Sequence, residues 1–268
     1  PELVDFLVSR TRGNPFYLYQ AVLTLIDRRV LTPSGLGRWQ CAASLLSRLV
    51  LPASLSKIVE KRLAGRGADE MSVLRLLALW EGELSLSLAA RLSGLKPGAV
   101  RALAHRLDQD NLLEYDPERG RLSLTQAEIR QAVLSSFPAL SRVAWHLRIL
   151  LTLEALGKSE TYAEELVYHA EEGRRYDKAL SFALLVARQS MQLMAPAHAC
   201  QFLRRAEGLA RRIKRCPRRT LYQLYLQWGQ AERWRGHLGE SREYLEQARI
   251  FLDRGPGGDQ LSLEEGQV

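Results

Sequence analysis

The chain has 268 residues, 46% apolar and 25% charged, so it can bury at least one substantial core. No run of about 18 apolar residues occurs, which argues against a membrane span and against a membrane partner. The three cysteines form no CxxC pair, so we expect free thiols and a cytoplasmic location. Because the chain begins with Pro1 and lacks an initiating Met, we expect it to be part of a longer protein.

A tight turn leads into the first predicted helix. Residues 11–18 are TRGNPFYL, and apolar side chains then recur at helical spacing from Tyr17 to Arg29. Residues 32–39 contain the proline and glycines of a turn between two short extended segments. A further helix is predicted to begin at Leu51-Pro52.

Three short helices and a hairpin are predicted next. The helices cover Met71–Trp80, a segment that starts at Ser85 and ends at Gly94, and a segment that starts at Pro97. Two extended segments then flank the turn sequence DPERG at 116–120, which predicts a β-hairpin. Three helices followed by a hairpin are typical of a winged helix.

Helices are predicted without interruption from Gln126 to about residue 253. Their segments lie near 126–136, 138–156, 160–172, 176–193, 196–214, 217–235 and 238–253. The last pair places Gly229, Gly236, Ser241, Leu245 and Ala248 at the small and large positions of a tetratricopeptide-like (TPR-like) hairpin. The predicted fold is therefore mainly α, with a helical lid segment, a winged helix and a TPR-like α-solenoid.

The net charge of +8 is concentrated between Gln201 and Thr220. Nucleic acid, an anionic membrane or an acidic protein could bind such a helix, but most charge runs are solvated faces. Phe202 has the spacing of a packed residue and is unsuited to base stacking. Partner binding is predicted for five arginines of this helix: Arg204, Arg205, Arg211, Arg212 and Arg215.

The order of these elements resembles the C-terminal part of the bacterial STAND, or AAA-type, signal-transduction ATPases. The resemblance depends on Gly13-Asn14-Pro15-Phe16-Tyr17-Leu18, Gly37-Arg38-Trp39 and Leu51-Pro52-Ala53-Ser54-Leu55. It implies a lid element of an ATPase module at 1–48, a winged helix at 49–137, TPR-like repeats at 138–254 and a flexible tail at 255–268.

The resemblance also implies nucleotide contacts. Pro15 would pack against adenine, and Gly13 would let the backbone turn, whereas a simple helix-entry turn is the alternative. No GxxxxGK[ST] phosphate loop occurs, so we expect no cofactor in this chain and ATP or ADP only in the full-length parent. Gln126 stands where relatives carry a phosphate-contacting histidine, and a surface or capping role is the favoured interpretation.

No catalytic or metal-binding motif is evident. The five histidines lie on different predicted helices, without HExxH or an i, i+4 histidine pair. His169 is interpreted as part of a solvated helix end, and Glu171-Glu172 as charged surface. We therefore expect no enzyme activity from this chain.

The leading hypothesis is a non-catalytic regulatory region that couples nucleotide state to a protein partner or small ligand on the repeats. Its own ATPase module would be a second partner. The alternative is a nucleic-acid-binding regulator that uses Arg101, His105 and Arg106 of the winged helix, or the basic helix 201–219. Carboxylates such as Asp108 and Asp116 near the wing count against DNA.

Overall fold

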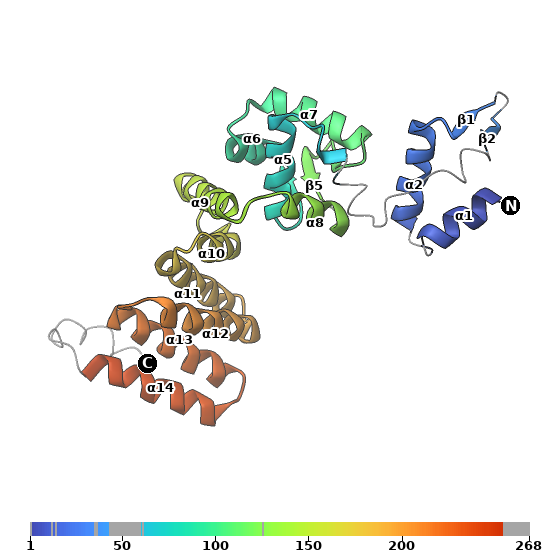
Figure 1. The fold of residues 1–268 in the computed structure, drawn as a ribbon. Coiled ribbons are helices and arrows are strands. Elements are labelled where there is room, and N and C mark those ends of the chain that lie inside the picture. The colour runs from blue at the N-terminus through green and yellow to red at the C-terminus, as the bar shows by residue number, and fades with distance from the viewer. Residues whose placement is uncertain are drawn as a thin grey trace. The chain divides into compact units, whose positions relative to one another are not determined.

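The structure, a computed structural model, is mainly helical (Figure 1). It describes residues 2–11, 13, 15–34, 37–42, 60, 62–124 and 126–253. The chain divides into two compact units between Phe137 and Pro138, and each is considered by itself. The helix expected at Leu51-Pro52 and the tail 255–268 lie outside the described residues.

The first unit begins with two helices and a small hairpin. Leu25, Ala21 and Leu31 are buried with Leu7 and Val30 in a local core. The two strands pair antiparallel, with Thr32 opposite Gln40. The elements are α1 (Glu2–Thr11), α2 (Pro15–Asp27), β1 (Leu31–Pro33) and β2 (Trp39–Cys41). The predicted helix and hairpin are confirmed, whereas α1 was not predicted.

From Ala68 onward, the described residues of the first unit combine four helices with a three-stranded antiparallel sheet. The strand order is β3-β5-β4, and Leu122 of the central strand is fully buried. Leu122 pairs with Leu84 on one side and with Tyr115 on the other. The elements are α5 (Ala68–Leu79), β3 (Leu84–Ser85), α6 (Leu86–Ser93), α7 (Pro97–Gln109), β4 (Glu114–Asp116), β5 (Arg121–Ser123) and α8 (Ala127–Ser135).

Local chemistry sets the helix ends here, as the sequence predicted. Ser85 is the N-cap of α6, and its Oγ accepts a hydrogen bond from the Leu88 N–H. Gly94 ends this helix in the left-handed conformation with φ of 76°. Pro97 occupies the first position of α7, where its missing N–H costs nothing.

Arg130 of α8 holds the C-terminal end of α5. Its Nη1 lies 3.1, 2.7 and 2.8 Å from the carbonyl oxygens of Leu77, Ala78 and Trp80. Its Nη2 lies 3.3 Å from the carbonyl oxygen of Leu124. The last carbonyls of a helix such as α5 lack partners within that helix, and a cation at this end also complements the helix dipole. Arg130 therefore fixes α8 to α5.

The second unit is a series of helices in which each packs against the next in sequence. Its elements are α9 (Ala139–Ala155), α10 (Ala163–Glu172), α11 (Tyr176–Gln192), α12 (Pro196–Arg212), α13 (Arg218–Trp234) and α14 (Leu238–Asp253) (Figure 1). Their bounds agree with the predicted segments to within about three residues.

One turn geometry recurs three times in this unit. Arg174, Met194 and Gly236 each adopt a left-handed conformation, with φ of 58°, 57° and 82°. The next residue in each turn donates a backbone hydrogen bond to the carbonyl five residues earlier: Arg175 to Ala170 (2.7 Å), Ala195 to Ser190 (2.8 Å) and His237 to Glu232 (2.9 Å). This Schellman pattern ends one helix and reverses the chain into the next.

The predicted small positions permit close packing of α13 and α14. An added Cβ at Gly229 would lie 2.6 Å from Leu245 Cγ, which is too close for an unchanged structure. Ser241 is buried and donates a hydrogen bond of 2.8 Å to the Gly229 carbonyl. Ala248 is also buried, so the spacing of small residues correctly predicted the contact face.

Candidate functional site

The N-terminal turn places Gly13 and Pro15 on the surface. Gly13 has φ of +77°, and no atom lies within 4 Å of an added Cβ, so conformation favours glycine there. Pro15 is the first residue of α2, which also fits the simple helix-entry interpretation. Asn14 lies outside the described residues. The adenine contact of Pro15 stays a prediction.

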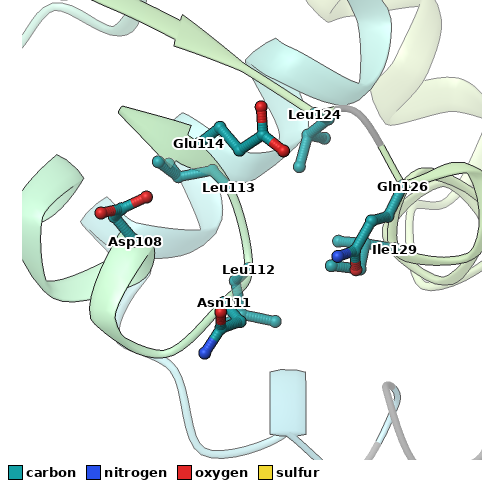
Figure 2. Close-up of a pocket in the computed structure, with 8 residues that line it drawn as sticks. All are labelled: Asp108, Asn111, Leu112, Leu113, Glu114, Leu124, Gln126 and Ile129. Carbon is teal, nitrogen blue, oxygen red and sulfur yellow. The ribbon is translucent and has the colours of Figure 1, made fainter. Parts of the chain in front are cut away.

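A small cavity of about 80 Å³ lies between the end of α7, the start of the hairpin and α8 (Figure 2). Gln126 occupies the N-cap position of α8 without a side-chain capping bond. Its buried Oε1 has no hydrogen-bond partner among the described residues. The lining residues are Asp108, Asn111, Leu112, Leu113, Glu114, Leu124, Gln126 and Ile129.

The chemistry of this cavity is unfavourable for a phosphate. Asp108 and Glu114 contribute carboxylates to its wall, and like charges repel at short distance. Asp108 Oδ1 also accepts a hydrogen bond from the Tyr115 N–H at 3.2 Å. The carboxylates of this lining give no support to a phosphate contact by Gln126.

The basic helix predicted at 201–219 corresponds to α12, the following turn and the start of α13. Its apolar side is buried through Leu203, Ala206 and Leu209, as its spacing predicted. The opposite side exposes Arg204 and Arg211, and further basic residues follow: Arg212, Lys214, Arg215, Arg218 and Arg219.

Three of the five predicted binding arginines are engaged within the chain. Arg205 Nε lies 2.8 Å from Glu171 Oε2, and Arg212 Nη1 lies 3.3 Å from Glu171 Oε1. Arg211 pairs with Glu207 at 3.0 Å. Glu171, expected to be simple charged surface, thus joins α10 to α12. Arg204 and Arg215 have no ion pair within the described chain, so they are the most available for a partner.

The outer side of α7 also exposes positive charge. Arg101, His105 and Arg106 are exposed on it, and His105 packs edge-on against Tyr115 with ring centroids 4.9 Å apart. Asp116 accepts hydrogen bonds from the backbone N–H groups of Glu118 and Arg119, so this wing carboxylate shapes the turn. Its Oδ2 also lies 3.8 Å from Arg119 Nε, so the negative charge of Asp116 remains on the wing.

A buried histidine pair joins α9 to α10. His146 and His169 are 3% and 1% exposed, and their Nδ1 atoms lie 2.9 Å apart. Burial, with a smaller contribution from the positive charge of Arg142, lowers the pKa of His146 to about 4. Burial lowers the pKa of His169 to about 3, with His146 adding to the effect. The prediction that His169 belongs to a solvated helix end is wrong, because α9 packs against α10 at this point.

A serine, a histidine and a glutamate also come together, from α11, α12 and α10. Ser190 Oγ lies 2.8 Å from His198 Nδ1, and His198 Nε2 lies 3.7 Å from Glu164 Oε1. Ser190 is only 4% exposed and donates its hydroxyl proton to the Val186 carbonyl at 2.8 Å. A buried hydroxyl with its proton already engaged is a poor nucleophile, so this cluster links helices.

Cys200 of α12 is likewise inert. Its thiol is buried, and burial together with the nearby Glu232 carboxylate raises its pKa to about 11. Glu232 is held by Arg235 Nη1 at 2.9 Å and by His237 Nδ1 at 2.9 Å. This group stabilises the turn between α13 and α14.

Comparison with protein-family models, curated proteins and solved structures finds no match for the chain. Within the described ranges, no three or more His, Cys, Asp or Glu side chains are grouped so as to hold a metal ion. None of the described helices is both long and apolar enough to cross a bilayer.

Proposed function

We propose that this chain is a non-catalytic region of a signal-transduction ATPase and that it serves regulation and protein interaction. In this proposal, the ATPase is similar to transcriptional regulators. In this proposal, α5–α8 and their sheet form a winged helix that contacts the ATPase module of the same protein. ATP or ADP binds in that module, and nucleotide state shifts the winged helix. The helices α9–α14 form TPR-like repeats that bind a protein partner or a small ligand.

The order of elements is the observation that carries the proposal. Three helices, α5, α6 and α7, are followed by the β4–β5 hairpin, and β3 pairs with β5. This is the arrangement expected of a winged helix, and it lies between the α1–β2 segment and the helical series, as in the resembling ATPases.

The helical series supports the repeat interpretation. Three turns share one Schellman geometry, and each helix packs on its neighbour in sequence. Chains of this kind bury their apolar faces by stacking successive hairpins, which leaves an extended surface for partners. Arg204 and Arg215 are exposed cations of this surface without an ion pair in the described chain, and we assign partner binding to them.

The coding region upstream of Pro1 tests the proposal. We expect a GxxxxGK[ST] loop about 200 to 250 residues earlier, which is roughly the length of a nucleotide-binding domain. An upstream region without a nucleotide-binding motif would contradict the proposal. Charge reversal at Arg204 and Arg215 should also weaken binding of the protein partner.

Nucleic-acid binding is the alternative, favoured by the exposed Arg101, His105 and Arg106 of α7. Its test is a salt titration with duplex DNA. Binding that weakens steeply with salt and depends on Arg101 supports the alternative, and no measurable binding at low salt excludes it.

A further inference from the structure

A shallow, open groove of about 450 Å³ runs along α14, beside the C-terminal end of α13. Leu238 at the start of α14 is 69% exposed, and Leu245 one heptad later is 38% exposed. The groove is lined by Arg233, Leu238, Ser241, Arg242, Leu245, Glu246 and Arg249.

Leucine and arginine alternate along this groove. Leu238, Arg242, Leu245 and Arg249 follow one another at i, i+4, i+7 and i+11, so they lie on one side of the helix. This side of α14 is held against α13, because Leu245 packs against Gly229 and Ser241 donates a hydrogen bond to the Gly229 carbonyl. The groove is therefore a preformed surface.

The charge of the groove identifies the chemistry of its occupant. Three arginines face a single acid, Glu246, among the described lining residues. Arg242 Nε pairs with Glu246 Oε1 at 3.0 Å, so this acid is already neutralised, and Arg233 has no ion pair among the described lining residues. The described lining has no aromatic side chain to stack on a nucleic-acid base.

We propose that this groove binds an acidic amphipathic helix of a partner protein. Its apolar side chains would cover Leu238 and Leu245, and its carboxylates would pair with Arg233 and Arg242. The inference rests on the proposed function, because it assigns one partner surface within the helical repeats.

A designed peptide tests the groove with the whole chain. The probe is a fluorescent helix of about 16 residues with leucine and glutamate repeated at i, i+4 and i+7 spacing. A matched peptide carries lysine in place of every glutamate. We expect the acidic peptide to bind by fluorescence anisotropy and the basic peptide to bind at least about tenfold more weakly.

Three variants locate the binding. Leu238→Ser and Arg242→Glu change exposed side chains, so the fold should be retained, and each should weaken acidic-peptide binding by about tenfold or more. Arg188→Glu changes an exposed arginine outside the groove lining and is the control. Equal binding by all three variants would overturn the proposal.

Other occupants give different results, and each would overturn the proposal. Self-association in sedimentation velocity that is lost in Leu238→Ser would assign the groove to a second copy. Peptide binding seen only after removal of residues 254–268 would assign it to the chain's own end. Binding of a single-stranded oligonucleotide through Arg242, without peptide binding, would assign it to nucleic acid.

The two proposals fail separately. Peptide binding combined with an upstream region that lacks a nucleotide-binding motif would leave the groove intact and remove the ATPase assignment. An upstream phosphate loop without peptide binding would support the ATPase assignment and remove the groove proposal.

Discussion

The buried imidazoles of His146 and His169 should make the second unit sensitive to mild acid. Their Nδ1 atoms share one hydrogen bond, so one ring donates and the other must stay unprotonated at this atom. A second proton would remove the acceptor and place charge in a buried site. Since both pKa values are lowered, the pair contributes stability above pH 6.5 that is lost as pH falls toward the folded values of about 4 and about 3.

The size of the effect follows from the protons taken up on unfolding. At pH 5 an unfolded histidine with a pKa of about 6.5 is almost fully protonated, while both folded rings stay neutral. The difference is about 2 kcal/mol for each histidine, or about 4 kcal/mol for the pair, between pH 7.5 and pH 5. Urea unfolding at both pH values measures this loss, and hydrogen exchange on α9 and α10 locates it.

The double variant His146→Leu/His169→Leu supplies the comparison. It removes both titrating rings, so its loss of stability between pH 7.5 and pH 5 should be smaller than that of the parent chain by about 4 kcal/mol. His105→Gln, which changes an exposed ring, should keep the full loss. The same pH dependence in the double variant and the parent chain would refute the reasoning.

Four substitutions test the packing. Arg130→Met should destabilise the first unit by about 3 kcal/mol in thermal unfolding, because it leaves the α5 carbonyls without a cationic donor, and a loss below about 0.5 kcal/mol would contradict this role. Gly229→Ala should cost about 1–3 kcal/mol because its Cβ meets Leu245, whereas Gly208→Ala, with nothing within 4 Å, should stabilise by about 0.5–1 kcal/mol. Equal effects of the two glycine changes would argue against the close contact. Glu171→Gln should cost about 1 kcal/mol in urea unfolding, since its partners are partly exposed, and should lose this effect at high salt.

Local chemistry made much of the fold predictable. Ser85, Gly94 and Pro97 mark helix ends through a side-chain cap, a left-handed backbone and a fixed φ, and each of these acts within a few residues. The spacing of Gly229 and Ser241 likewise indicated that α13 and α14 pack closely, since small residues at fixed offsets permit contact between helices.

The features that escaped prediction depend on contacts between distant segments. Strand β3 has two residues, and it is defined by its pairing with β5 almost forty residues later. Glu171 and Arg130 resemble ordinary surface charges until the fold places carbonyls or arginines beside them. His146 and His169 are 23 residues apart on separate helices, so their hydrogen bond has no signature in the sequence.

Hydrogen exchange in the full-length parent protein, with ADP and then with ATP bound, tests the central claim most directly. The proposed function predicts that amide protection in α5–α8 differs between the two nucleotide states, because in that proposal these elements contact the ATPase module and move with its nucleotide state. Identical protection of α5–α8 in both states, with nucleotide binding verified, would contradict it.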